Sequence, residues 1–349
     1  MYFVLYDRNF KSIGETYILE SWNRIQRATD FDNINIVGEE TPYSAEPFFI
    51  IINNKQGKQL FSGLASTPTI NEKTKKTSLS LKDYMTLLNS EIVINWNLFS
   101  GTTVSSYIEF VFSNWLGQID VGLKNIVCDV SSILEEPLDT EIYSFSGLQN
   151  VLAYTLVSDA ILYYDLYCEP ILDLRKKSLT FVFKKAYINP LSIRLSDFGI
   201  NTVEKSFGDY NRATVYNHNF EKAQEWALTQ NNNIVKLPSM DNLVYPTKNK
   251  NFIAEQPNNN LTEEQALFNA TYDAVIGLSE NRYQENIDLN VQQYKSIIDL
   301  TKVDFSYKIN IYTKEGEYKT LPVGEIETDS KGKHIVRLGH RIQELTQEI

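Results

Sequence analysis

The hydrophobic and polar pattern of the first hundred residues predicts strands with one helical tail. Residues 2–7 and 12–20 are rich in Tyr, Val and Ile, which strands favour. Residues 47–66 form a predicted hairpin around a Gly-containing turn, and residues 68–81 form a second one around a lysine-rich turn. A short helix is expected next, because apolar side chains recur at helical spacing at Leu81, Tyr84, Met85 and Leu88.

The pattern changes between residues 96 and 171, where helices alternate with strands. Residues 102–116 predict a helix with Thr or Ser as its cap. Residues 146–160 predict a second helix capped by Ser146, whose apolar stripe is Leu148, Val151, Leu152 and Leu156. Strands are expected at 161–169 and 179–186. This part of the chain is therefore predicted to be a small α+β module.

The next part of the chain combines a strand, a long irregular stretch and a helix. Residues 210–219 predict a strand. Residues 231–260 are rich in Asn, Pro and Lys without a regular period, which is typical of a long loop or inserted subdomain. Residues 261–276 predict a helix that begins after Thr262 with acids in its first turn, and residues 286–294 predict a strand.

Residues 48–88 and 307–346 present the same elements in the same order. Each stretch has a strand, a Gly turn, a strand with a central glycine, a charged turn, a further strand and a predicted helix, with Gly63 and Gly324 at matching places. An internal repeat fixes architecture, so the pattern predicts two similar small antiparallel barrels. The alternative is that hairpins with Lys-Gly turns are common and the match is coincidental.

The predicted fold class is α+β and β-rich, with two similar antiparallel β-barrel domains and inserted α+β domains. We expect the first barrel at 1–95 with 172–205, and the α+β domain at 96–171. The second barrel is expected at 206–245 with 288–349, and a loop and helix subdomain at 246–287.

Acidic residues dominate one window of a chain with formal net charge −11. No Lys or Arg lies between Lys124 and Arg175, so a basic face for nucleic acid is not expected there. The candidate acidic residues are Glu135, Glu136, Asp139 and Glu141. They are interpreted as a solvated face, as the lining of a channel that repels phosphate, or as a weak calcium site.

No catalytic or metal-binding motif in the sequence points to an enzyme or a cofactor. Cys128 and Cys168 stand in apolar contexts and are predicted to be buried thiols. His218, His334 and His340 match no His-Glu-x-x-His pattern, and Gly-x-Ser-x-Gly and phosphate-loop motifs are absent. No signal peptide or apolar stretch of membrane-spanning length is found. We expect no catalytic residue, metal or cofactor.

Residues 60–96, 208–219 and 320–345 resemble the baseplate hub proteins of long-tailed phages. The likeness is to the N-terminal region of tail-associated lysin (Tal) proteins of siphophages that infect Gram-positive hosts, lactococcal type in particular. It follows the order of elements over nearly the whole chain, and no single motif is diagnostic.

The resemblance implies a virion protein of the tail tip or baseplate that forms a homotrimer at the distal end of the tail tube. Two barrels in each of three subunits present six similar units, which suits a sixfold tube or distal tail ring. The implied partners are the chain itself and the distal ring protein, with receptor-binding proteins and the tape-measure C-terminus as further candidates. Opening for DNA passage at infection is implied, without sequence-specific nucleic-acid binding.

Two other functions stay open from the sequence. A carbohydrate-binding host-recognition protein would use exposed Tyr, Trp and Asn, although the four Trp are scattered. A cell-wall hydrolase would need paired carboxylates; with the second barrel close to Ile349, we expect no separate lytic domain.

Overall fold

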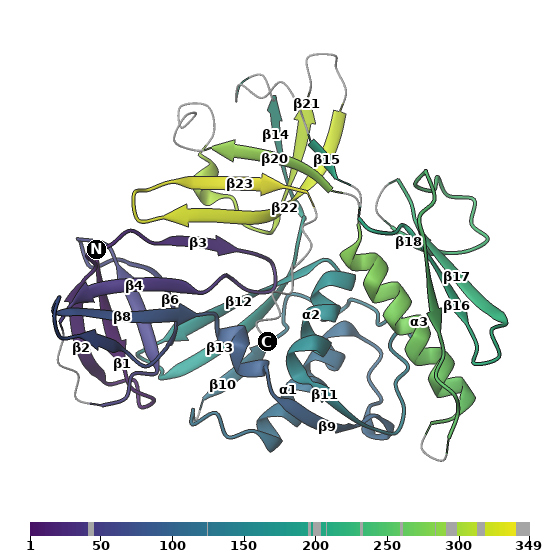
Figure 1. Ribbon diagram of the computed structural model, residues 1–349, viewed down its shortest axis with the longest axis horizontal. Helices are drawn as coiled ribbons and strands as arrows, with labels where there is room; N and C mark the ends of the chain where they lie inside the picture. The colour runs from purple at the N-terminus through teal and green to yellow at the C-terminus, as the bar shows by residue number, and fades with distance from the viewer. Residues whose placement is uncertain are drawn as a thin grey trace.

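The computed structural model describes residues 1–40, 45–123, 125–194, 197, 204–206, 208–230, 233–258, 261–282, 284–290, 299–312 and 318–339. Four regions are visible in Figure 1: a curled sheet at the left, a second curled sheet at the top, an α+β region at the centre and bottom, and a smaller sheet with its helix at the right. The chain is mostly β, with two curled half-barrel sheets and small helical parts, as the sequence predicts.

The first sheet has the strand order β2-β1-β5-β6-β8-β4, with β7 added to β8. Strands β4 and β8 alternate buried with more exposed side chains, as a sheet with one covered face requires, whereas β5 is buried at every position. The bounds are β1 (Tyr2–Tyr6), β2 (Ser12–Tyr17), β4 (Ile34–Glu39), β5 (Phe49–Asn53), β6 (Gln59–Ala65), β7 (Thr69–Asn71) and β8 (Lys76–Lys82).

The first sheet curls until its two end strands meet at one bridge. Ile18, directly after β2, bridges antiparallel to Gly38 of β4. A Cβ on Gly38 would lie 2.7 Å from Thr16 Cγ2 and 2.8 Å from Phe3 Cε1, so a larger residue does not fit there. The curled sheet encloses its own core, which includes Phe3, Leu5, Ile50 and Leu81.

The α+β region follows the first sheet through a 3-10 helix in place of the expected α-helix. The helix α1 begins after Thr103, whose side chain and that of Ser106 form a capping box, so the cap expected from the sequence is confirmed. The bounds are η1 (Tyr84–Leu88), β9 (Glu91–Asn95), η2 (Trp96–Leu98), α1 (Val104–Gln118), β10 (Ile126–Asp129), β11 (Leu148–Leu152), α2 (Ala153–Tyr163), β12 (Leu166–Asp173) and β13 (Ser178–Lys185).

The second helix begins later than the sequence predicts. Residues 148–152 form the strand β11, which pairs antiparallel with β9, and α2 starts at Ala153 without a side-chain cap. Leu148 is 72% exposed, so the predicted stripe and the Ser146 cap are wrong. The apolar residues that suggest a helix also suit a strand, and pairing with β9 decides the outcome.

The third sheet, at the right of Figure 1, has the order β18-β17-β16-β19 and packs against α3. The predicted loop at 231–260 therefore contains two strands, β18 and β19. Strand β19 joins the sheet by pairing parallel with β16. The capping box at Thr262 confirms the predicted helix start. The bounds are β16 (Arg212–Tyr216), β17 (Lys222–Leu228), β18 (Ile234–Lys236), β19 (Asn249–Ile253) and α3 (Glu263–Glu280).

The second curled sheet has the order β14-β21-β22-β23-β20-β15, with β3 added to β22. Its central part repeats the first sheet: β5-β6-β8-β4 and β21-β22-β23-β20 are both antiparallel, with the earliest strand beside the latest. The bounds are β3 (Asn23–Gln26), β14 (Asn189–Arg194), β15 (Glu204–Ser206), β20 (Gln284–Asn290), η4 (Leu300–Lys302), β21 (Tyr307–Tyr312), β22 (Tyr318–Asp329) and β23 (His334–Leu338).

Several segments pair outside the units to which the sequence assigned them. Strand β14, expected in the first barrel, pairs parallel with β21, and β3 pairs with β22. Strand β13, also expected in the first barrel, pairs with β10 and β12 in the α+β region, and β16 and β17, expected in the second barrel, form the third sheet. Strand pattern alone does not select a partner, so pairing over long distances in sequence decides these assignments. The expected helix after the second barrel, with His340, lies outside the described residues.

Candidate functional site: the junction between the two barrels

The strand β3 joins the first part of the chain to the second barrel. Gln26 pairs with Ile326, and Asn23 pairs with Asp329. The N–H of Ser330 also donates to the carbonyl of Trp22 at 3.0 Å. A segment close to the N-terminus thus adds a strand to a sheet made of residues far along the chain, which links the two barrels through backbone hydrogen bonds.

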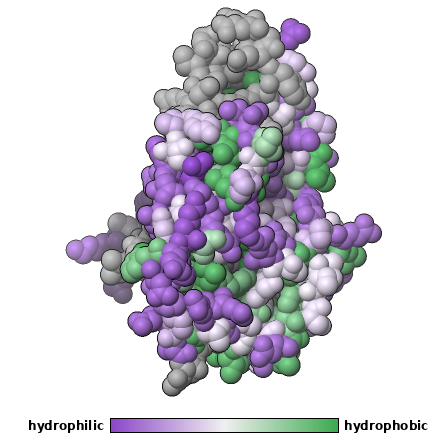
Figure 2. All heavy atoms as spheres, turned by 90° about the vertical axis from the view of Figure 1, so that its right-hand side faces the viewer, coloured by the Kyte–Doolittle hydropathy of each residue, from purple (hydrophilic) through white to green (hydrophobic). Residues whose placement is uncertain are grey.

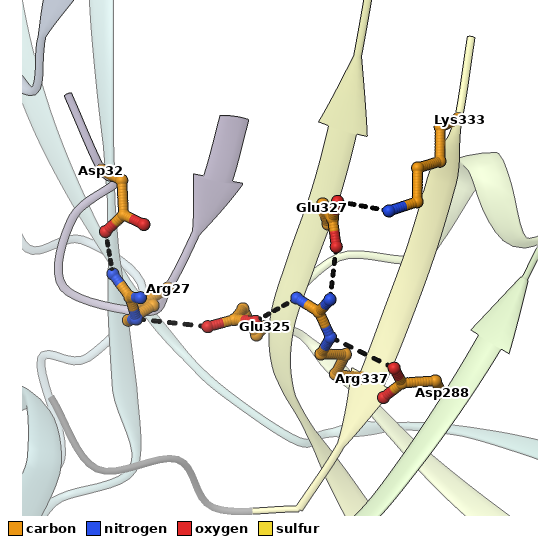
Figure 3. Close-up of polar contacts among 7 residues, drawn as sticks. All are labelled: Arg27, Asp32, Asp288, Glu325, Glu327, Lys333 and Arg337. Atoms are coloured by element: carbon orange, nitrogen blue, oxygen red, sulfur yellow. Dashed lines mark hydrogen bonds and ion pairs between the residues drawn. The ribbon is translucent and has the colours of Figure 1, made fainter. Parts of the chain in front are cut away.

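A chain of ion pairs crosses this junction (Figure 3). Arg27 contacts Asp32 at 2.5 Å and Glu325 at 3.3 Å. Glu325 also pairs with Arg337 at 2.5 Å. Arg337 further contacts Glu327 and, at 3.4 Å, Asp288. Because Glu325 is only 5% exposed, Arg27 and Arg337 compensate a charge that would be costly to bury alone.

The same contacts set the protonation of Glu327, which is also 5% exposed. Burial raises the pKa of Glu327, but hydrogen bonds and charge from Lys333 and Arg337 outweigh it and hold this pKa below its usual value. Burial lowers the pKa of Arg337, and Glu325 reverses the effect so that this pKa is raised. Glu327 and Arg337 therefore stay charged near neutral pH.

A cleft of about 590 Å³ lies beside the network, where both barrels meet β12. Arg24 projects among its lining residues, with its guanidinium carbon 4.6 Å from the ring centre of Phe31 and 4.9 Å from that of Phe61. Burial lowers the pKa of Arg24 to about 10, partly opposed by Asp83. Stacking between two rings is favourable for a guanidinium.

Asp83 is one of the residues that line this cleft, and it caps η1. Its carboxylate accepts the N–H of Met85 at 2.7 Å. Burial raises the pKa of Asp83 to about 7; this hydrogen bond and Arg24 oppose the rise, while Asp30 adds to it. The cleft thus holds a buried acid that is largely neutral below pH 7 beside a half-buried arginine.

Two further titratable side chains, His334 and Cys168, line the same cleft. Within the described part of the chain, no three His, Cys, Asp or Glu side chains are grouped to hold a metal ion. Burial lowers the pKa of His334, with opposing contributions from Leu300 and Asp299. Burial also raises the pKa of the Cys168 thiol well above its usual value, so this thiol is not activated as a nucleophile.

The four predicted acidic residues lie on the stretch between β10 and β11. Glu136 pairs with Lys185 at 2.8 Å, and Glu141 pairs with Lys236. Asp139 accepts a hydrogen bond from the Tyr163 hydroxyl at 2.7 Å. Glu135 is exposed. Three of the four therefore hold neighbouring elements together, and a channel lining stays a prediction.

Gly63 and Gly324 lie in the equivalent central strands of the two barrels, β6 and β22. A Cβ on Gly63 would lie 2.4 Å from the Lys82 carbonyl oxygen, so β8 approaches β6 too closely for a side chain. Gly324 lies where the pairing of β22 with β23 shifts register. Their superposition stays a prediction.

The ion network is not among the features predicted from the sequence. A signal was present, because Glu325 and Glu327 alternate with Ile326 in a strand and Arg337 lies in the next one. Two acids on one strand face opposite an arginine are typical of a cross-strand charge cluster. The contribution of Arg27, about 300 residues away, has no local signature.

The face formed by the third sheet and α3 is mainly polar. Figure 2 shows this side with hydrophilic side chains over most of its area and hydrophobic ones in separate patches. Large exposed apolar side chains in this region include Phe220, Met240 and Tyr245. No helix in the described residues combines the length and hydrophobicity needed to cross a membrane.

Comparison with known proteins gives matches in structure alone. No family model matches the chain, and no curated protein matches its sequence. A prophage MuSo2 43 kDa tail protein from Shewanella oneidensis has TM-score 0.50 and 11% identity over 98% of both chains. The tail protein from Neisseria meningitidis MC58 has TM-score 0.49 and 12% identity over 93% of both.

A third similar structure is the prophage tail protein gp18 from Listeria monocytogenes EGD-e, with TM-score 0.48 and 10% identity over 98% of this chain and 95% of that one. Sequence identity this low carries information on the fold and not on the function. The chain therefore shares its overall fold with the prophage MuSo2 tail protein, and its own two barrels are joined through β3.

Proposed function

We propose that the chain is a structural hub protein of the tail tip or baseplate of a long-tailed phage, of the Tal N-terminal-region type. In this proposal it forms a homotrimer that caps the distal tail tube, matches threefold to sixfold symmetry and opens for DNA passage. It carries no enzymatic activity, and its partners are the distal ring protein and further copies of itself.

The observation that carries the proposal is the shared strand order of the two barrels in one chain, β5-β6-β8-β4 and β21-β22-β23-β20. Two similar units in each subunit, repeated three times, provide six similar positions around a ring, so a trimer can meet a sixfold partner. Each early barrel would pack beside a neighbour's late barrel in a heterologous interface that closes after three copies. The acidic stretch at 135–141 would face the axis, where negative charge repels DNA phosphates.

The solution mass of the purified chain tests the proposal. We expect a particle of three times the 40.2 kDa chain by light scattering at micromolar concentration. A monomer, both alone and with a tail-ring protein, would contradict it. Loss of turbidity in host cell walls treated with the pure protein would contradict the non-enzymatic role.

A further inference from the structure

Sheet edges in this protein are protected in different ways. An unpaired edge offers N–H and C=O groups to any other strand, and proteins block such edges with proline or with a covering side chain. In β12, the N–H of Cys168 points away from β13 and bonds to the carbonyl of Ala28 at 3.0 Å. Pro170, whose backbone faces the same way, has no N–H to offer. Along β9, the side-chain amide of Gln118 bonds to both the N–H and the carbonyl of Val93. Neither edge is therefore open to a further strand at these residues.

In the described part of the chain, the outer edge of β19 carries neither kind of protection. This strand ends the order β18-β17-β16-β19 and pairs with β16 alone, in parallel. The N–H of Ala254 bonds to the carbonyl of Tyr216 at 2.9 Å, and in this register the even-numbered residues of β19 bond to β16. The backbones of Asn249, Asn251 and Ile253 therefore face outward.

The outward residues of β19 are open to solvent. Every residue of the strand except Phe252 is exposed, and Ile253 is 52% exposed. A lysine can also protect an edge, but the Lys250 ammonium lies over two rings, 4.8 Å from the centre of Tyr210 and 5.1 Å from that of Phe252. Both rings lie on the side of the sheet that α3 covers, so Lys250 leaves the edge clear. The backbone groups of the outward residues are therefore available to a strand of another molecule.

Acids lie along the side of this edge that α3 covers. The helix, which runs along the third sheet in Figure 1, touches the strand at Gly277, where a Cβ would lie 3.7 Å from Phe252 Cζ. Asp273 and Glu280 lie four residues before and three residues after Gly277, which places them on the same side of the helix. Both are exposed, and so is Glu255, two residues beyond β19. The open edge is thus bordered by carboxylates.

Lys250 is the cation that lies near these carboxylates. Burial and the charge of Glu255 raise the pKa of Asp273, and Lys250 opposes the rise. Burial also raises the pKa of Glu280, again opposed by Lys250. No ion pair in the described part of the chain involves any of the three carboxylates, so one ammonium faces three negative charges when all are ionised. A further positive charge placed here is therefore stabilised.

The opposite side of the edge is polar. The Thr214 hydroxyl donates to Asn249 Oδ1 at 2.9 Å, and the Asn249 amide donates to Asn251 Oδ1 at 2.6 Å. These side chains form a row along the outer face of the sheet, with Ile253 as its apolar end. A strand beside β19 therefore meets acids on one face and amides on the other, and this pattern selects the side chains that it carries.

We infer that β19 is the docking edge for an extended, basic segment of another protein, which adds to the third sheet as a further strand. Main-chain hydrogen bonds to Asn249, Asn251 and Ile253 give such a contact its affinity, and alternate side chains give it specificity. The segment carries Lys or Arg at the positions that face Asp273 and Glu280, and polar side chains at the positions between them. The contact goes beyond the proposed function and is independent of the trimer.

Peptides with blocked ends test this edge on the full-length chain. The probe is a peptide of about nine residues that alternates Lys with Thr, and the control peptide has Glu in place of Lys. Amide hydrogen exchange, followed residue by residue by NMR, reports strand addition, because the outward N–H groups have no strand partner in the free chain. We expect the Lys peptide to slow exchange at Asn249, Asn251 and Ile253 about tenfold when nine-tenths of the sites are occupied. The amide of Ala254, already bonded to β16, is the internal reference.

Two pairs of variants separate backbone pairing from charge. Asn251→Pro removes an outward N–H, so we expect it to weaken binding of the Lys peptide about tenfold, whereas Asn251→Ala keeps that N–H and should bind within about twofold of the wild type. Asp273→Lys/Glu280→Lys should reverse the preference from the Lys peptide to the Glu peptide. Its control, Glu72→Lys/Glu109→Lys, makes the same change in total charge at exposed positions outside the third sheet and should keep the preference for the Lys peptide.

The results separate this edge from the trimer. Unchanged exchange at the outward residues with the Lys peptide at millimolar concentration would overturn the site, and so would equal slowing by the Lys and Glu peptides. If Asn251→Pro does not fold, the preference of Asp273→Lys/Glu280→Lys decides alone. A rise in solution mass that Asn251→Pro abolishes, without any effect of the peptides, would make a second copy the occupant in place of a basic segment. A wild-type monomer that still binds the Lys peptide would contradict the trimer and leave this site standing.

Discussion

The two barrels share a strand order but stabilise their buried carboxyl groups in opposite ways. At the end of the first barrel, Asp83 has its pKa raised to about 7 by burial. In the second barrel, ion pairs with Lys333 and Arg337 outweigh burial and hold the pKa of Glu327 below its usual value. A buried acid is tolerated when it is neutral or when it is paired, and this chain uses one solution in each barrel.

The comparison also extends to how each sheet is completed. The first sheet closes on itself at the Ile18–Gly38 bridge, whereas the second takes β3 from the N-terminal part of the chain. The ion network of Figure 3 lies at that borrowed strand. The second barrel is therefore completed by a strand from a distant part of the sequence, whereas the first is closed by residues that are close in sequence.

Loss of Arg337 should have the largest effect on stability. Arg337→Met removes partners from two carboxylates that are each 5% exposed, so we expect the free energy of unfolding to fall by about 3 kcal/mol at pH 7. Urea denaturation measures this value. Lys302→Met is the control, because its partner Asp299 is on the surface and the Lys302 side chain is 80% exposed. Equal losses of unfolding free energy in the two variants would show that the buried ion pairs of Arg337 do not stabilise the second barrel more than a surface pair does.

The pH dependence of stability tests whether the buried Asp83 carboxyl of the first barrel is neutral. A carboxyl with a raised pKa binds its proton more tightly in the folded state, so its contribution is present at low pH and is lost as pH rises from about 4 to about 7. Between pH 5 and pH 8, we expect the wild type to lose about 2 kcal/mol more than Asp83→Asn.

Urea denaturation at the two pH values gives this difference. Both proteins keep Asp159, whose pKa burial raises to about 7 while a hydrogen bond from Tyr272 opposes it, so its contribution cancels. Identical pH dependence in the two proteins would show that Asp83 is ionised in the folded chain.

Two glycine substitutions sharpen the comparison of the strands themselves. Gly63→Ala places a Cβ 2.4 Å from the Lys82 carbonyl oxygen, and we expect a loss of about 1–2 kcal/mol in unfolding free energy. Gly324→Ala should cost a similar amount if the two positions are equivalent. The control is Gly117→Ala in α1, where a Cβ meets no atom within 4 Å. If Gly324→Ala leaves the unfolding free energy unchanged while Gly63→Ala lowers it, the two positions are not equivalent.

The smallest effect is expected from Lys333, which shares Glu327 with Arg337. Its side chain is 37% exposed, so Lys333→Met should cost about 0.5–1 kcal/mol at pH 7. Because the pKa of Glu327 is held low in the folded state, its stabilising effect is lost as pH falls through that folded pKa. As the pH is lowered, the unfolding free energy of the variant should therefore fall less than that of the wild type. If the two proteins lose the same amount of stability in acid, groups other than Glu327 cause the loss.

The sequence alone was sufficient for features that depend on neighbouring residues. The start of α1 at Thr103 and of α3 at Thr262 follow from capping boxes within four residues. The two barrels follow from hairpins whose strands are close in sequence, such as β5–β6 and β21–β22. Local hydrogen bonds and short turns fix these elements wherever they lie in the fold.

The tertiary structure decided features that join distant residues. Apolar residues at 148–152 suit either a helix or a strand, and pairing with β9 selects the strand. Strands β3 and β14 join the second sheet through partners far along the chain, and the contact of Arg27 with Glu325 exists because of that pairing. A strand pattern states which face is buried but not which strand lies beside it, since backbone hydrogen bonds are the same for every partner.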